Sequence, residues 1–494
     1  MKIWPFSRKR KPRRTSAAAF KRGYVAGKSS RLYTDWPTYT ASANEEIKAA
    51  LNVLRSRCRE LARNNDYARK FLSMVKSNVV GRDGFKLQAC AINAADGKPD
   101  DLANQMIEAS WREWGKKGNC TVDGKLSWID ACRLWIECIA RDGEVIVKKY
   151  HNWQGNKWGF AIGFLEPSML QTDYEQEVRG GGKIRMSVEL DKFGRPVAYH
   201  LLTYDPDDNL LSGPVVSTRE RIPAEYIMHD FVSEFAGQVR GVPWMHTAGK
   251  RLHMLDGYEE AELVASRTAA AKMGIFTSTS GDKYVGEDDD TAEGRDSAPI
   301  MDASPGTFEQ APDGLEFNMF DPTHPTTAFE ACVMTLLRGA ASGLGVSYVG
   351  LANNLRGVNL SSIRQGSLDE QEFWRELQTF TEGRLITPVF EAWLLRSIAS
   401  GALKLPLAKI DKFKRVKWHP RRWKRVDPVK EITANETSVR MGVKSIQDVA
   451  GEQGRDIETV FEDMAKAKAL AEKHGLTLSV FAGGTESGGT KNDD

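Results

Sequence analysis

Apolar residues between positions 42 and 80 recur every three or four residues, which is the spacing of one helix face. They are Ile47, Leu51, Leu54, Cys58, Leu61, Ala68, Leu72 and Val75. Asn44 is a candidate N-cap, Gly81 is a natural stop, and the polar "RNND" between them indicates a break into two helices.

Two further helices are predicted over 100–114 and 128–141. Ser127 is the expected cap of the second, and "RDG" closes it. Four tryptophans in these segments are expected in the hydrophobic core: Trp111, Trp114, Trp128 and Trp135.

The next stretch is rich in strand-forming patterns. The segments "GEVIVKKY", "WGFAIGFLE" and "AEYIMHDFV" each fit one strand, and "GGKIRMSVELDKFGRPVAYHLLTY" alternates on both sides of a turn at 191–194. That alternation predicts a hairpin.

After Pro243 the pattern becomes helical again for about 30 residues, or roughly 45 Å. Two short strand-like pieces, "GIFTSTS" and "GLEFNMF", then flank an acid-rich stretch, and "TTAFEACVMTLLRGAASGLG" predicts another helix. A polar, glycine-rich loop over 342–366 precedes a long helix that Pro388 must kink or break. The order is helix, small module, helix, loop, helix.

The loop at 342–366 is unusually long for a compact domain, and such loops are usually functional or disordered. Its "GVSYV" is one glycine short of a nucleophile elbow, because Val349 stands where the last glycine belongs. A helix rather than a strand precedes it. Ser347 is therefore interpreted as a loop serine and not as a nucleophile.

The remainder of the chain contains a basic strand, "KFKRVKW", and a turn, "HPRRWKRVDP". Three short helices are predicted over 428–475. The final "AGGTESGGTKNDD" is predicted to be disordered because it contains too few apolar residues to be buried.

Composition fits a globular protein of about three domain-sized units, since 41% of its 494 residues are apolar and 27% are charged. No apolar run approaches the roughly 18 residues of a membrane helix, and the N-terminus lacks a signal-peptide pattern. We therefore expect a protein without a membrane segment that is made in the cytosol.

The net charge of +3 conceals a strong asymmetry. Residues 1–34 carry eleven Lys or Arg and no acid, and residues 404–430 carry eleven against two acids. The rest of the chain is therefore strongly acidic. This division favours a phosphate-bearing partner for the basic segments, although a solvated tail and surface fit each segment equally well when it is taken alone.

Candidate chemistry is weak elsewhere. Six cysteines without a Cys-x-x-Cys pair are interpreted as small buried residues, and His246 with His253 share a helix face for packing more often than for metal binding. "GYVAGKS" has Arg22 where a phosphate-binding loop needs its first glycine. The carboxylates Glu287, Asp288, Asp289 and Asp290 fit a solvated loop better than a metal site.

Several segments in this order resemble the lambda-type portal proteins of tailed bacteriophages, from about residue 40 to 475. They are "RNNDYARKFLSMVKSNVVG", "RDGEVIV", "LDKFGRPVAYHL", "RIPAEYIMHDFVSEFAGQVRGVPWM", "GLGVSYVGL" with "NLSSIRQG", and "DPVKEI" with "GVKSIQDVAGEQGRD". Each segment is weak alone, but their order and spacing are specific. Leu360 departs from the family, in which an aromatic residue often follows the asparagine.

The resemblance implies an α+β portal fold with wing, stem, clip and crown regions, assembled into a ring that is usually of twelve subunits. The implied division is a basic disordered arm (1–40), the wing (41–242), the first stem helix (243–272), the clip (273–325), the second stem helix (326–343), the tunnel loop (344–362), a long kinked helix with the wing return (363–426), crown-like helices (427–475) and a disordered tail (476–494).

The resemblance also implies a function without catalysis or cofactor: a ring at one capsid vertex through which a terminase packages double-stranded DNA and through which DNA later leaves. Partners would be the terminase large subunit, the major capsid or scaffold protein and head–tail adaptor proteins, in the virion and, during assembly, in the host cytoplasm. Residues expected at the DNA channel are Gly345, Tyr348, Asn353, Asn354, Arg356 and Asn359. Those expected at terminase docking are Glu287, Asp288, Asp289 and Asp290.

A second hypothesis from the residues is a monomeric metal-dependent nuclease that uses the carboxylates near residue 288 and grips DNA with its basic segments. It predicts cleavage by a monomer, whereas the portal hypothesis predicts a large ring and no catalysis. The acidic body fits the portal hypothesis, because a channel that neutralised many phosphates would hold DNA too tightly to let it slide.

Overall fold

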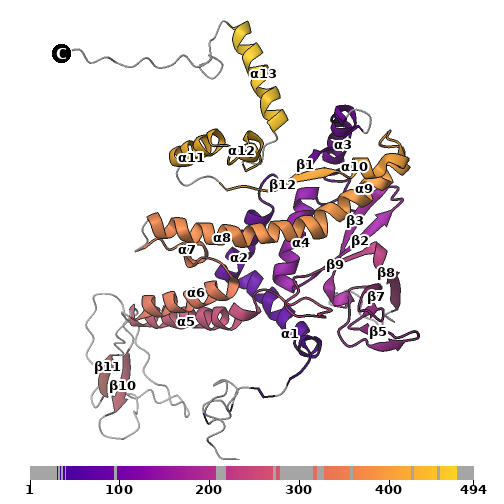
Figure 1. The fold of residues 1–494 in the computed structure, drawn as a ribbon. Helices are drawn as coiled ribbons and strands as arrows, with labels where there is room; N and C mark the ends of the chain where they lie inside the picture. The colour runs from indigo at the N-terminus through magenta and orange to yellow at the C-terminus, as the bar shows by residue number, and fades with distance from the viewer. Residues whose placement is uncertain are drawn as a thin grey trace, which may run out of the picture.

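The structure is a computed structural model of the chain. It describes residues 31, 34, 37, 38, 40–93, 97–206, 218–270, 274–278, 315–319, 328–356, 360–423, 428–452 and 457–474. Most of the expected basic arm, the acid-rich stretch and the C-terminal tail lie outside this part of the chain. Helices and small antiparallel sheets alternate in separate regions (Figure 1), which confirms the α+β class.

The predicted pair of N-terminal helices is present as α1 (Ala43–Asn64) and α2 (Asp66–Val79). Asn65 separates them, because its side chain accepts a hydrogen bond from the Ala68 N–H and starts the second helix. The predicted cap Asn44 is wrong: Ser42 caps α1. Asn44 is buried instead and bonds the backbone of Gly237 and Val239, 193 and 195 residues away.

The four tryptophans are buried as predicted. Trp111 and Trp114 of α3 (Asp101–Trp114) and Trp128 of α4 (Trp128–Asp142) form an aromatic core with α9 (Thr387–Ala399), whereas Trp135 of α4 lies 5.6 Å from Phe380 between ring centroids. Trp111 lies 4.8 Å from Trp114 and 5.0 Å from Trp393 between ring centroids. Trp114 and Trp393 are fully buried. Residues some 280 positions apart therefore share one core.

Three small antiparallel sheets lie in this part of the chain, and the largest packs on a second hydrophobic cluster. Strands β2 (Val145–His151), β3 (Phe160–Leu165) and β9 (Ile227–Asp230) form a sheet in the order β3-β2-β9. A second sheet follows chain order and consists of β4 (Gln176–Val178), β5 (Gly182–Arg185), β6 (Val188–Leu190), β7 (Pro196–Leu202) and β8 (Arg219–Pro223). In a third sheet, β1 (Lys86–Ala89) pairs with β12 (Val416–His419) and joins distant parts of the chain.

The predicted hairpin turn at 191–194 joins β6 to β7. The strand expected before it is interrupted, because Met186 and Ser187 both adopt positive φ, of 47° and 68°, and form an extra turn between β5 and β6. Apolar alternation continues through such a turn, so the pattern alone does not reveal it.

A helical hairpin extends from the core (Figure 1), formed by α5 (His246–Ala270) and α6 (Phe329–Leu344). Between them the chain contains β10 (Gly274–Ser278) and β11 (Leu315–Met319), which correspond to the two predicted strand-like pieces. The two strands pair antiparallel. The short helix α7 (Tyr348–Ala352) then leads toward α8 (Leu360–Thr381).

The predicted effect of Pro388 is visible as a π-helical segment, η6 (Glu382–Ile386), between α8 and α9. The Thr387 N–H donates to the Glu382 carbonyl, because the proline that follows has no N–H to continue the α-helical ladder. The chain also contains the very short helices η4 (Pro167–Met169), η5 (Ala224–Tyr226), η7 (Leu407–Lys409) and α10 (Ile410–Phe413).

The three helices predicted near the C-terminus are α11 (Pro428–Arg440), α12 (Ile446–Glu452) and α13 (Ile457–Lys473). They bury little: Ala471 is the buried apolar residue among their described side chains.

Candidate functional site

The root of the α5–α6 hairpin is fixed by two glycines. Gly143 has φ +90°, and a Cβ there would lie 2.5 Å from the Val242 carbonyl carbon; a Cβ at Gly241 would lie 2.1 Å from the Gly143 oxygen. The Trp244 N–H donates to the Ala140 carbonyl at 3.1 Å. The chain entering α5 is thereby held against the end of α4 with no room for a side chain.

Small residues let α5 and α6 approach closely. Gly343 accepts a hydrogen bond from Thr247 Oγ1 at 2.6 Å, and a Cβ at Gly339 would lie 3.0 Å from Arg251 Nε. The inner half of the hairpin is part of the main core, where Ala248, Leu252, Ala340 and Ala341 are buried.

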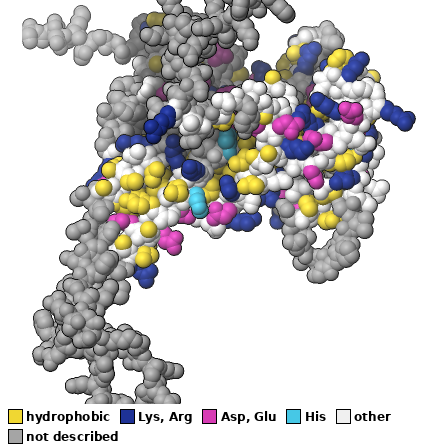
Figure 2. All heavy atoms as spheres, turned by 90° about the horizontal axis from the view of Figure 1, so that it is seen from below, with side chains coloured by type: hydrophobic (Ala, Val, Ile, Leu, Met, Phe, Trp, Pro, Cys, Tyr) yellow, Lys and Arg dark blue, Asp and Glu magenta, His cyan; other side chains and the backbone are white. Residues whose placement is uncertain are grey.

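Helix α5 leaves large apolar side chains in solvent, at Met254 in its inner half and at Leu263 and Val264 in its outer half. Met254 is 61%, Leu263 62% and Val264 54% exposed. Viewed from below, apolar side chains gather on this side of the molecule, over the helical hairpin (Figure 2). Isolated exposed apolar residues are ordinary, but several on one helix mark a surface that another molecule covers.

The cysteines are only partly as predicted. All six are free thiols; Cys58, Cys120 and Cys132 are buried, but Cys90 and Cys138 are half-buried and Cys332 on α6 is exposed. Burial raises the pKa of the Cys58 and Cys120 thiols to about 12, so these two remain protonated and serve as packing residues.

The expected uninterrupted loop between α6 and α8 is wrong in detail, because α7 interrupts it. Gly345 ends α6 with φ +69°, and Ser347 caps α7. Ser347 Oγ accepts from the Gly350 N–H at 3.1 Å and donates to Glu370 Oε2 at 2.7 Å. This geometry gives Ser347 a structural role, and Leu351 anchors the short helix in the core.

The other residues expected at the channel surround α7. Tyr348 is its first residue, Arg338 of α6 lies 5.4 Å from the Tyr348 ring centroid, and the Tyr348 hydroxyl accepts from Asn354 Nδ2 at 3.0 Å. Asn353 ends α7 with φ 51°. Arg356 is 79% exposed at its side chain and pairs with Glu330 of α6.

Asn359 and the four carboxylates Glu287, Asp288, Asp289 and Asp290 lie outside the described residues. The structure thus brings Gly345, Tyr348, Asn353, Asn354 and Arg356 together around one short helix between α6 and α8.

Within the described ranges, no three His, Cys, Asp or Glu side chains are grouped as a metal site would require. His246 uses its Nδ1–H to bond the Pro243 carbonyl at 2.8 Å. No helix in the same part of the chain combines the length and apolarity of a membrane span.

Part of the basic segment 404–430 has internal partners. Lys412 pairs with Asp100 and bonds Asn93, and Arg421 bonds Asn78 and donates to the Ser77 carbonyl at 2.8 Å. These contacts hold the return segment near β12 to the N-terminal helices. The charge count of a sequence cannot distinguish such internal pairs from a free basic surface.

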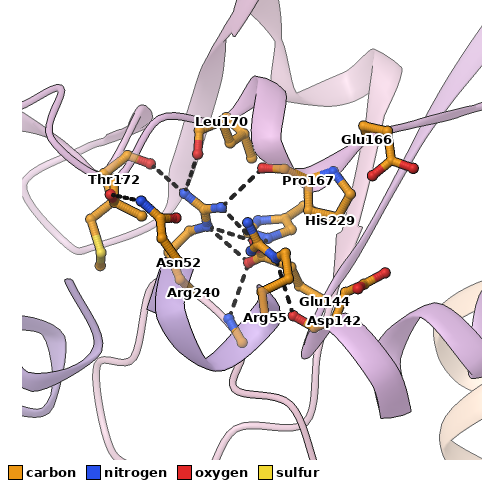
Figure 3. A network of polar contacts seen from close by, with 12 residues as sticks. Asn52, Arg55, Asp142, Glu144, Glu166, Pro167, Leu170, Thr172, His229 and Arg240 are labelled. Atoms are coloured by element: carbon orange, nitrogen blue, oxygen red, sulfur yellow. Dashed lines mark hydrogen bonds and ion pairs between the residues drawn. The ribbon is translucent and has the colours of Figure 1, made fainter. Parts of the chain in front are cut away.

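Sequence reasoning missed a buried ionic network behind α1 (Figure 3). Arg240 and Glu144 are both fully buried and paired, and His229 Nε2 lies 3.0 Å from Glu144 Oε2. Burial opposes ionisation of Glu144, but Arg240 and His229 outweigh it and hold the pKa of Glu144 well below its usual range. The local sequence gives no signal for the pair, since 96 residues separate its members.

The family model "Phage portal protein, lambda family" matches residues 29–378. The chain belongs to this family. The model covers the helical hairpin, α7 and most of α8, so the resemblance seen in the short motifs is confirmed.

Curated relatives agree over nearly the whole chain. A "Probable portal protein" of Halomonas phage phiHAP-1 is 33% identical over 455 residues, covering 91% of this chain and 87% of the relative. "Portal protein B" of Escherichia phage lambda is 21% identical, covering 89% of this chain and 88% of the relative. The portal protein of Escherichia phage N15 is also 21% identical, with 92% and 91% covered.

Among solved structures, a chain of the virion of a native gene transfer agent particle matches with a TM-score of 0.44 at 11% identity, over 81% of this chain and 93% of that chain. A chain from the neck of the empty particle matches with a TM-score of 0.42 at 12% identity, over the same shares.

The expected portal function, in phage DNA packaging and head–tail attachment, is thus confirmed at the level of the family. Portal proteins are virion components at the capsid vertex, and the family is structural and not catalytic. No observation on the described residues favours the nuclease hypothesis.

Proposed function

We propose that this portal protein forms a closed ring, of twelve subunits as is usual in the family, with an axial hole for double-stranded DNA. The exposed apolar side chains of α5 carry the proposal. This helix of 25 residues leaves Met254, Leu263 and Val264 in solvent. Contact with neighbouring copies would remove their apolar surface from water, which is favourable. A head-to-tail contact whose rotation closes gives such a ring.

In this ring α5 and α6 are the two stem helices, and the segment 273–325 with β10 and β11 is the clip at their outer end. The proposed docking surface for the terminase large subunit is the clip, including the carboxylates of 287–290. The wing comprises the parts before α5 and the return after α9, and α11–α13 form the crown-like region. The further proposed partners are the major capsid or scaffold protein and head–tail adaptor proteins, with assembly in the host cytoplasm.

The proposed channel lining is the segment 344–362 around α7. Its support is the position of α7 between α6 and α8, with one strongly exposed cation, Arg356, and the amide of Asn353 at its end. Such groups make brief contacts to phosphate and sugar that carry no sequence information. A single exposed arginine per subunit is too few to hold the duplex against a motor.

Light scattering and electron microscopy of the purified protein test the ring. We expect particles of many subunits with a central hole. Monomers at micromolar concentration, with no rings in the images, contradict the proposal.

Removal of 352–357 tests the channel segment in a packaging assay with rings, procapsids and terminase. On the channel hypothesis rings and procapsids form, but full-length DNA is not packaged or not retained. If the segment only packs between subunits, ring assembly itself fails.

Replacement of Arg356 by Glu is the milder companion experiment. The Arg356–Glu330 pair is exposed at 79% and 57%, and such pairs contribute little to stability. Ring formation is expected to be unchanged and packaging nearly so. The doubly exchanged variant Arg356→Glu with Glu330→Arg keeps the pair with reversed charges, and an assembly defect in Arg356→Glu that this variant repairs contradicts the channel assignment.

A further inference from the structure

A cavity of about 630 Å³ opens between α1 and the residues that follow β3. One wall is a single face of α1, where Arg55, Arg59 and Arg63 recur every four residues and therefore lie above one another. The facing wall carries the polar side chains of Ser168, Gln171 and Thr172 and one carboxylate, that of Asp173. The cavity is therefore hydrophilic and lined on one side by guanidinium groups.

The arginines at the inner end are held by the buried network (Figure 3). Arg55 is 5% exposed and donates from Nη2 to Glu144 Oε1 at 2.7 Å. Arg59 donates from Nε to Asp142 Oδ1 at 2.6 Å. Both guanidinium groups are thereby fixed in orientation before any ligand arrives, which lowers the entropic cost of binding.

In this network Arg55 and Arg240 are buried, whereas Arg59 and Arg141 are partly exposed. The guanidinium groups of Arg55, Arg59, Arg141 and Arg240 share the two buried carboxylates of Asp142 and Glu144. A third carboxylate, Glu166, bonds Arg59 but is 45% exposed at its side chain. Arg240 alone occupies both oxygens of Glu144, so Arg55 shares its carboxylate with a second cation.

Two observations indicate that the positive charge of Arg55 is only partly balanced by its partners. Burial lowers the pKa of Arg55 against the attraction of Glu144. Its Nη1 group has no hydrogen-bond partner among the described residues, although the side chain lines the cavity. Arg63, at the outer end of the cavity, also has no hydrogen-bond or ion-pair partner among the described residues. A buried cation with unused donors at a cavity is suited to an anionic ligand.

We propose that this cavity binds a phosphate group, which Arg55 and Arg63 contact as cations and Thr172 contacts through its hydroxyl. Asn52, whose Nδ2 lies 3.2 Å from Thr172 Oγ1, positions that hydroxyl (Figure 3). The volume exceeds that of an inorganic phosphate and lies in the range of sites for small molecules. The phosphate therefore belongs to a nucleotide-sized molecule or to the backbone of DNA. The site does not depend on the proposed channel.

Titration calorimetry of the full-length protein tests the site, with deoxyadenosine monophosphate, inorganic phosphate and a short DNA duplex as separate probes at matched ionic strength. Arg63→Gln is the main variant, because Arg63 is exposed and its replacement leaves the buried network intact. Arg57→Gln is the matched control on the same helix: Arg57 is exposed and does not line the cavity.

We expect a phosphate-bearing probe to bind the wild type and the Arg57→Gln control equally, and to bind Arg63→Gln about tenfold more weakly, as the loss of one charge-assisted hydrogen bond implies. Thr172→Val is expected to weaken binding in the same direction. Binding of the mononucleotide or inorganic phosphate assigns the site to a free ligand, and binding of the duplex alone assigns it to the DNA backbone.

The proposal is overturned if the folded wild type binds none of the three probes. It is also overturned if Arg63→Gln and Arg57→Gln weaken binding by the same factor, because the effect is then one of net charge. Arg55→Gln is a supplementary variant, used only where circular dichroism shows that it remains folded.

Discussion

The aromatic core buries its large apolar side chains, whereas the outer half of α5 leaves its own exposed to solvent. In the core, Trp114 and Trp393 are fully buried, and their partners come from the same subunit. On α5, Leu263 and Val264 remain mostly in solvent. The core is completed within a single chain, whereas in the proposed ring another subunit covers the apolar side chains of α5. A substitution should therefore affect subunit stability in the first region and assembly in the second.

Trp393→Ala is expected to have the largest effect on the subunit. The side chain is fully buried against Trp111 and Phe390, and its loss leaves a cavity. The free energy of unfolding should fall by about 3–5 kcal/mol in urea titrations at fixed subunit concentration. Phe193→Ala, at a position 77% exposed, is the control and should change it by less than about 0.5 kcal/mol. Equal losses in the two variants would remove the distinction between core and surface.

Asp230→Asn sharpens the description of the packed region through pH. Burial raises the pKa of Asp230 to about 7, although Arg384 and Lys149 act to lower it. Between about pH 4 and pH 7 the folded state keeps a proton that the unfolded state has released. The free energy of unfolding of the wild type therefore falls as pH rises through this window.

Asparagine cannot ionise, so the Asp230→Asn variant lacks that fall. Its advantage over the wild type should grow from near zero at pH 4 to a few kcal/mol at pH 8, at about 1.4 kcal/mol per pH unit within the window. Urea titrations at four pH values measure the difference, in which the other titrating groups cancel. A constant difference between the two proteins from pH 4 to pH 8 would show that Asp230 is ionised throughout.

Ser347→Ala lies at the border between the two regions and should have a smaller effect. It removes the α7 cap and the bond to Glu370, so the free energy of unfolding should fall by about 1 kcal/mol. Ser347→Thr keeps the hydroxyl and should recover most of the loss. Equal destabilisation by Ala and Thr would point to a steric role for the serine in place of capping.

Val264→Asp should have the smallest effect on the subunit, within about 0.5 kcal/mol, because the side chain is 54% exposed. Its effect on assembly should be large. Light scattering should show fewer rings or none, since an unpaired charge would be buried between subunits. Arg267→Asp, at an exposed polar position of the same helix, is the control. Intact rings from Val264→Asp would place the subunit contact elsewhere.

Local patterns along the chain were enough to predict the helices, most of the strands and the family. Apolar spacing predicted α1 to α4, and Pro388 predicted a kink or break in the long helix, where the structure has a π-helical segment; these signals act over a few residues. The motifs of the family can also be found along the sequence, in the order in which the family has them.

The contacts between polar residues that are far apart in the sequence became visible only in the folded chain. The tertiary structure placed Asn44 beside Val239, Arg240 beside Glu144, and three arginines of α1 on the wall of one cavity. It also showed that α7 interrupts the expected loop and that Met186 and Ser187 form an extra turn. Periodicity reports the direction in which a side chain faces, but a hydrogen-bond partner is set by packing between distant segments, which no local pattern encodes.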